Sequence, residues 1–445
     1  MRVARPGERW IVLAAAVGVM VVVGAAYSWS LYTRPLMAFY GWSSLQVAFV
    51  FSILMAFVGV GAVVGGILHD RFGPRRIALL GVACWSAGSV FGGLGLSRFG
   101  VVWLDVVYGA VGGLGCGILY IVPGATVTKW FPEERGLANG LTLCGFGFGA
   151  LVFNLIVRAV PAFARVADAA HRVIMERNAA IVAGRPFALP ASLERIDAGV
   201  IAHTFVWSGL AYLVIGGLCS LVLHPPPAGY SVPKAAAKLA LERDVSPGEM
   251  LRTPAFYVIW VMLFINGTAG LALLCNAVPL YAEATHESGA AAIGAFGWIS
   301  AANGGGRLLW AWLSDVLGRL PSLAVCFVLE AIALLAIPKT HDVVVVTVAF
   351  ALVLLCFGGI FAIVPAVAAD FYGTRFFGED YSFLISAASA AGLAGPLLVA
   401  GLEDAFGSMT AWLAPVAAAL ACAALLTLLA RKPNAPAAMA AATGT

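Results

Sequence analysis

Twelve runs of about 20 predominantly apolar residues follow one another along this 445-residue chain. A run of that length can cross the hydrocarbon core of a bilayer as a helix. Only helices and closed barrels satisfy their backbone hydrogen bonds inside lipid, so the runs predict an all-α polytopic membrane protein. We place the twelve spans at 10–36, 45–68, 76–97, 101–128, 136–160, 204–223, 254–282, 290–313, 322–338, 343–369, 381–402 and 409–430.

The composition excludes most other classes of protein. Only 11% of the residues are charged, against about 25% in a soluble domain. All eight cysteines fall in or beside apolar runs, without the spacing of metal ligands, and free cysteine packs as a small hydrophobe. The sequence also contains no nucleotide-binding loop and no Ser/His/Asp set at catalytic spacing. We therefore expect no enzyme activity, no metal or other cofactor, and no nucleic-acid partner.

A polar stretch at residues 224–252, which begins with three prolines after His224, divides the apolar runs into two sets of six. We interpret residues 1–223 and 253–432 as an N-terminal and a C-terminal six-helix bundle, joined by this linker. The Ala-rich tail, residues 433–445, is expected to be disordered.

One long segment between the spans, residues 161–203, departs from the short loops elsewhere. Its stretch Arg165–Arg177 has the pattern of an amphipathic helix. We expect a solvated cap over one mouth of the protein. A partner-binding role is the alternative, and nothing in the sequence favours it.

Lysines and arginines are distributed unevenly between the two sides. Sixteen lie in the tails and loops on the side of the N-terminus, whereas only Arg34, Arg98 and Lys339 lie in the short loops opposite. Because cytoplasmic loops carry the excess of positive charge, we expect both termini in the cytoplasm.

Arg307 lies deep inside the eighth span, where a cation costs roughly 2.5–3.5 kcal/mol on insertion scales. Such a charge usually faces a partner, a cavity or a substrate path. We interpret Arg307 as the counter-ion of a transported anion; pairing with Asp315 or a backbone carbonyl is the alternative. Asn303 lies one helical turn earlier and Ser300 lies on the same stripe, so both are candidate binding residues. The intervening Gly304–Gly306 would let another helix approach closely.

Two related charged elements close the second and eighth spans. An aspartate at a helix end and the arginines after it can form a charge clamp between helices, although they can also serve only to set topology. The residues of the candidate clamp are Gly66, Asp70, Arg71, Gly73, Arg75 and Arg76 in the first half and Asp315 and Arg319 in the second.

The element Gly66–Arg76 resembles the loop signature of the major facilitator superfamily. Five further stretches resemble the oxalate/formate antiporter family, a relative of the monocarboxylate porters: 27–32, 129–140, 248–254, 303–307 and 370–373. The resemblance implies twelve transmembrane helices in two six-helix bundles. It also implies a secondary transporter that works by alternating access, as a multi-pass protein of the inner (plasma) membrane. We expect it to function as a monomer.

The same resemblance assigns roles to individual residues. Arg307 matches the family's substrate-binding arginine, and Tyr27 and Tyr120 match positions that line the cavity. The family's aromatic positions are occupied here by Phe146, Phe357, Phe361 and Ile385. The chain departs from the family's oxalate exchanger in two polar positions: Ala388 stands where that protein has a second cation, a lysine, and Ala26 where it has a glutamine. A dianion favours two cations, so the sequence favours a monocarboxylate such as lactate, pyruvate or formate.

The coupling of transport is left open between proton symport and anion exchange. Glu330 in the ninth span is the one acid that we expect to be buried, and we consider it a candidate proton relay. No acid lies between Pro254 and Tyr281 in the seventh span. Three alternative functions remain: an oxalate/formate exchanger, an exporter of drugs or lipophilic ions, and a carboxylate sensor that does not transport.

Overall fold

The computed structural model describes residues 7–131, 135–182, 199–227, 230, 245–373, 377–406 and 408–432. Within these ranges the regular structure is helical throughout and includes no strand, which confirms the all-α prediction. Most of the linker, the middle of the loop at 161–203 and the tail at 433–445 lie outside the described residues.

Within the described ranges, nine helical stretches are long and apolar enough to cross a membrane. One of them, Pro74–Trp130, reverses direction at Gly100, where φ is 73°, and so crosses twice. Two further helices complete the twelve spans: α11, which carries Arg307, and α15, the apolar helix near the C-terminus.

The N-terminal helices are α1 Glu8–Gly24, η1 Ala25–Ser28, α2 Ser30–Tyr40, α3 Ser44–Phe72, α4 Pro74–Leu104, η2 Asp105–Gly112, α5 Gly113–Trp130, α6 Arg135–Arg158, α7 Pro161–Val182 and α8 Gly199–Val222. The C-terminal helices are α9 Pro247–Met250, α10 Pro254–Thr285, α11 Gly289–Leu317, α12 Arg319–Ala336, η4 Ile337–Lys339, α13 Val343–Tyr372, α14 Phe377–Phe406 and α15 Leu413–Leu426.

Local sequence explains where several helices begin. The hydroxyl of Ser43 accepts from the backbone N–H of Gln46 at the start of α3, and the Gln46 side chain accepts from the Ser43 backbone in return. At the start of α10, the hydroxyl of Thr253 accepts from the backbone N–H of Phe256, and the following Pro254 suits the first helical position. These caps satisfy backbone donors that the first turn of a helix leaves free.

The two charged elements end their helices with the same backbone conformation. Gly73 separates α3 from α4 with φ 81°, and Gly318 separates α11 from α12 with φ 92°. Only glycine adopts such φ values without strain. The sequence repeat is therefore a structural repeat, as in transporters built from two related halves.

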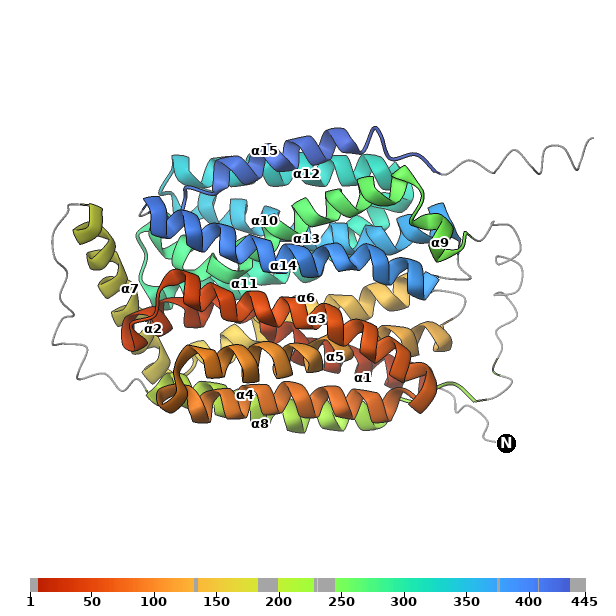
Figure 1. Ribbon diagram of the computed structural model, residues 1–445, viewed down its shortest axis with the longest axis horizontal. Helices are drawn as coiled ribbons and strands as arrows, with labels where there is room; N and C mark the ends of the chain where they lie inside the picture. Colours follow the sequence, from red (N-terminus) through yellow and green to blue (C-terminus); the bar gives the residue numbers. More distant parts are fainter. Residues whose placement is uncertain are drawn as a thin grey trace, which may run out of the picture.

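The helices form two bundles that lie side by side (Figure 1). Helices α1 to α8 pack mainly with one another, as do α10 to α15, while α3 with α14 and α6 with α11 make the main contacts between bundles. Figure 1 also shows α9 at one end of the molecule, hereafter the linker end, and α7 at the other, hereafter the α7 end.

Helix α7 is packed more closely than the sequence suggests. The amphipathic helix is present, but its apolar face is buried rather than solvated: Phe163, Val166 and Ile174 are each 1% exposed. The helices that α7 contacts include α2 and α11. Asp168 accepts a 2.7 Å hydrogen bond from the backbone N–H of Ala290 at the start of α11. Because α7 also contacts α2, it joins the two bundles at this end.

The glycine run in α11 permits close approach to two helices, as we expected. A Cβ at Gly304 would press on α6, where Phe148 and the carbonyl of Cys144 lie, and one at Gly306 would overlap the carbonyl of Leu355 on α13. The middle residue, Gly305, faces open space. Arg307 is thus held at a point where α11 lies directly against both neighbours.

We expect Gly306→Ala to lower the free energy of unfolding by about 1–3 kcal/mol, because the added methyl forces α11 away from the α13 backbone. Gly305→Ala is the matched control and should raise it by up to about 1 kcal/mol, because alanine favours the helix. Thermal unfolding of the purified proteins in detergent measures both. Equal stability of the two variants would contradict the close packing of α11 on α13.

Candidate functional site

Arg307 lies between the two bundles with its side chain almost completely enclosed, 1% exposed. Its Nε donates to Oδ1 of Asn303 at 3.3 Å, across one turn of α11. Its guanidinium carbon lies 5.3 Å from the centre of the Phe146 ring on α6. The Nη1 group is also buried, and it has no hydrogen-bond partner among the described residues. A buried guanidinium with a free N–H group can accept an anion without first breaking an ion pair.

Phe146 connects the predicted aromatic residues into one cluster beside this arginine. Tyr27 packs edge-on against Phe146 with ring centres 4.7 Å apart, and Tyr120 does so at 5.3 Å. Phe357 lies 6.2 Å from Tyr27 and 5.1 Å from Phe361. The structure therefore brings residues of η1, α5, α6 and α13 together around Arg307.

Ser300 is bonded within its own helix and not to Arg307 in the described part of the chain. The residue is 1% exposed, and its hydroxyl donates to the carbonyl of Gly297 at 2.7 Å. Ser300 shares the helix stripe of Arg307, but a role in binding remains a prediction.

The second charged element forms a cluster at the linker end. Arg319 pairs with Asp315 at 2.5 Å and with Asp370 at 3.2 Å, and donates to the hydroxyl of Ser314 at 2.6 Å. In the described part of the chain Asp315 pairs with Arg319 and forms no ion pair with Arg307. The alternative in which Asp315 neutralises Arg307 is therefore wrong.

The first charged element shows no comparable cluster among the side chains that the structure describes. Arg71, Arg75 and Arg76 are exposed, and the side chain of Asp70 lies outside the described part. Gly66 lies 3.9 Å, measured from a Cβ built on it, from the side chain of Ile121. A clamp between the bundles at this point remains a prediction.

Glu330 is buried as expected, at 0% exposure. Its neighbour is Asn266 of α10, whose amide nitrogen lies 3.3 Å from both carboxyl oxygens when the amide is turned toward them. Both residues belong to the C-terminal bundle, and no ion pair to Glu330 is present in the described ranges. Its role as a proton relay remains a prediction.

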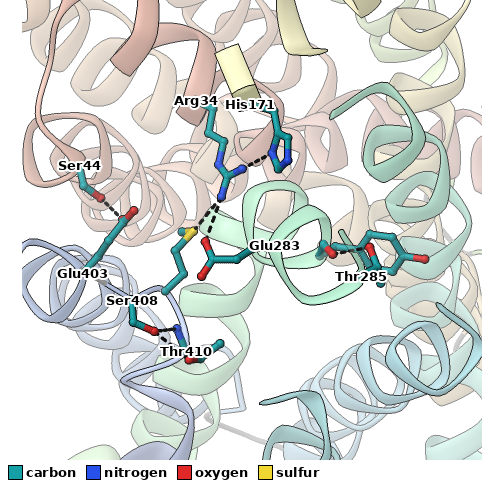
Figure 2. A network of polar contacts seen from close by, with 10 residues as sticks. Arg34, Ser44, His171, Glu283, Thr285, Glu403, Ser408 and Thr410 are labelled. Carbon is teal, nitrogen blue, oxygen red and sulfur yellow. Dashed lines mark hydrogen bonds and ion pairs between the residues drawn. The ribbon is translucent and has the colours of Figure 1, made fainter. Parts of the chain in front are cut away.

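Sequence reasoning missed two groups of residues. Tyr381 of α14 lies within electrostatic range of Arg307 and Tyr120, which adds a third tyrosine hydroxyl to the central cluster. The other group lies at the α7 end, where Arg34 meets His171 and Glu283 (Figure 2). We counted Arg34 with the short loops, but it lies inside α2, which continues the first span as far as Tyr40, and it is 4% exposed.

Glu283 lies two residues beyond Tyr281, just outside the acid-free stretch of the seventh span. Charge near a helix end looks like solvated loop charge in a hydropathy profile. Only the contact between bundles shows that it is buried.

The fold agrees with the comparison to known proteins. The family model described as "Major Facilitator Superfamily" matches residues 10–164 and 270–443. The chain belongs to the major facilitator superfamily. Members of this superfamily are transporters rather than enzymes, and the resemblance seen in the sequence is confirmed.

Individual relatives extend over most of the chain. The oxalate:formate antiporter of Oxalobacter formigenes is 30% identical over 411 residues, which are 92% of this chain and 88% of that protein. Apicoplast pyruvate carrier 1 of Toxoplasma gondii is 26% identical over 78% of this chain and 68% of its own. A solved structure of a bacterial homologue of the human lysosomal transporter Spinster, inward-facing and occupied, has a TM-score of 0.64 at 16% identity and covers 96% of both chains. The last comparison supports the fold alone.

We expect Asn303→Asp to stabilise the protein and to abolish its response to anions. An aspartate at this position would lie beside the Arg307 guanidinium and neutralise it, adding about 1–3 kcal/mol to the free energy of unfolding. Thermal unfolding with and without sodium formate measures both effects. Asn266→Asp is the matched control: it places a carboxylate beside Glu330 without a cation and should destabilise the protein. Retention of a formate-induced shift by Asn303→Asp would contradict an anion site at Arg307.

Proposed function

We propose that this protein is a secondary transporter that carries small carboxylate anions across the membrane by alternating access. The observation that carries the proposal is the buried Nη1 of Arg307, which has no partner among the described residues. A guanidinium stays charged at any relevant pH and can hold a carboxylate through two parallel hydrogen bonds. The bound anion would offset the cost of the buried charge.

The aromatic cluster supports a small, partly apolar anion. Tyr27, Tyr120 and Tyr381 each bring a hydroxyl that could bond to a substrate oxygen, while their rings and Phe146 form an apolar surface. Such a site suits a monocarboxylate such as lactate, pyruvate or formate. The relative named as a pyruvate carrier supports the same class of substrate.

A second candidate function is exchange of oxalate and formate, which the relative named an oxalate:formate antiporter favours. Ala388 argues against it, since it occupies the position where the family's oxalate exchanger has a lysine. This alanine lies against α10, where its Cα would be 3.7 Å from a Cβ on Gly267. The charge that would hold a second carboxylate is therefore absent from this position.

Alternating access would close the substrate site from one side at a time. The charge distribution along the sequence supports an orientation with the linker end in the cytoplasm, and we propose the inner (plasma) membrane as the location. In this orientation the α7 end faces outward. Coupling to protons and exchange of anions both remain compatible with the site at Arg307.

We expect Arg307→Ala to reduce uptake of labelled formate into proteoliposomes loaded with unlabelled formate by about 30-fold or more. Loss of one member of a buried charge pair costs about 2–5 kcal/mol of binding free energy. Arg307→Lys should restore little, because an ammonium group lacks the planar, bidentate geometry.

Arg98→Ala, which removes an exposed arginine, is the matched control and should transport normally. Normal uptake by Arg307→Ala would contradict the proposed function. Binding of formate without any flux would indicate a sensor instead. Competition by oxalate stronger than that by lactate would favour the second candidate.

A further inference from the structure

The α7 end holds a group of buried charges that the site at Arg307 does not use (Figure 2). Arg34 of α2 donates to Glu283 of α10 at 3.3 Å and contacts the sulfur of Met409 at 3.6 Å. Glu403 of α14 accepts a 2.5 Å hydrogen bond from the hydroxyl of Ser44 at the start of α3. Both contacts join the N-terminal bundle to the C-terminal bundle, so they exist only while the α7 end is closed.

The charges in this group do not balance. Arg34 is the cation of the group, and it pairs with Glu283. Glu403 is 6% exposed and lies within electrostatic range of Arg34 and Glu283, but it forms no ion pair in the described part of the chain. A buried charge without a cationic partner is costly, whereas a neutral carboxyl group is not.

Arg34 does not neutralise Glu403. Its Nε is buried and has no hydrogen-bond partner among the described residues, and its Nη2 pairs with Glu283. A charged Glu403 would therefore be buried without a cation bonded to it, which favours the neutral form. A protonated Glu403 needs only the Ser44 hydroxyl, which can both donate and accept.

His171 of α7 does not supply the missing positive charge. Its Nδ1 contacts Nη1 of Arg34, and because arginine only donates, Nδ1 must be the unprotonated nitrogen. Burial, and then the charge of Arg34, lower the pKa of His171 to about 4. The ring is therefore neutral at the pH values where Glu403 would exchange its proton.

The remaining titratable groups near Glu403 come from two helices. Cys275 of α10 lies within electrostatic range, and Asp404 follows Glu403 on α14 but is exposed. His286 lies near Glu283 at the end of α10. A cavity of about 10 Å³, large enough for about one water molecule, is lined by Arg34, His171 and Pro279.

We propose that Glu403 is a proton-binding site and that closure of the α7 end requires its protonation. When this end opens, Glu403 meets water and releases its proton; when the end closes, the carboxyl group must take up a proton before it is buried. Combined with the proposed function, on which this conclusion rests, a proton-binding Glu403 makes the protein a proton–carboxylate symporter. The closed, loaded form would then hold one anion at Arg307 and one proton at Glu403, without net charge on either group.

The sign of the pH effect distinguishes Glu403 from its neighbours. Since the closed form would bind one proton more than the open form, acid should favour closure, by up to about tenfold per pH unit in the ratio of the two forms. Protonation of His171 or Glu283 would instead break a contact of Arg34 and favour opening. The direction of the response is therefore decisive.

Hydrogen–deuterium exchange of the full-length protein in detergent, without any added carboxylate, tests this. Labelling times are scaled for the chemical exchange rate between pH 5.5 and 8. We expect peptides from α2, the start of α3 and the end of α14 to become more protected as the pH falls, while peptides at the linker end become less protected. Glu403→Gln, which imitates the protonated group, should stay protected at every pH, and Asp404→Asn should behave like the unmodified protein.

Three results would overturn the proposal: opening of the α7 end in acid, no response of the unmodified protein, or a full response in Glu403→Gln. Loss of the response in His171→Asn, with Glu403→Gln unaffected, would assign the proton to His171. Because no carboxylate is present, this test is separate from the proposed function. A pH response with no carboxylate uptake would leave the proton site standing, and uptake without a pH response would leave only the transporter.

Discussion

The buried, incompletely paired guanidinium of Arg307 is the interaction on which the rest of the structure depends. It is held by Asn303 one turn away, by the ring of Phe146 and by glycines that bring α11 against α6 and α13. These neighbours orient the charge without neutralising it. Charges inside the membrane usually mark a substrate or ion pathway, and this supports the proposed anion site.

Two buried groups at different positions can explain how transport and closure are linked. Arg307 lies at the centre between the bundles, whereas Glu403 lies at the α7 end, in a contact that forms only when the bundles meet there. Enclosing charged Arg307 without an anion, or charged Glu403 without a proton, costs free energy. In this account, an anion for one and a proton for the other together permit the closed form.

Much of the fold could be predicted because hydropathy and helix ends are local properties. The pairing of Asn303 with Arg307 was also predictable, since both lie one turn apart on one helix. The contact of Arg34 with Glu283 joins residues 249 positions apart and depends on how two bundles meet, which no local pattern describes. The buried face of α7 was missed for the same reason: its pattern was recognised, but the surface that covers it comes from other helices.

The central claim is tested most directly by solid-state NMR on the protein with bound formate. The measurement is the dipolar coupling between the ¹³C carboxylate carbon of formate and the ¹⁵N guanidinium nitrogens of Arg307, assigned by its loss in Arg307→Lys. We expect a measurable coupling, at the C···N distance that follows from N–H···O bonds with N···O distances of about 2.7–2.9 Å. Bound formate without coupling to these nitrogens would contradict it.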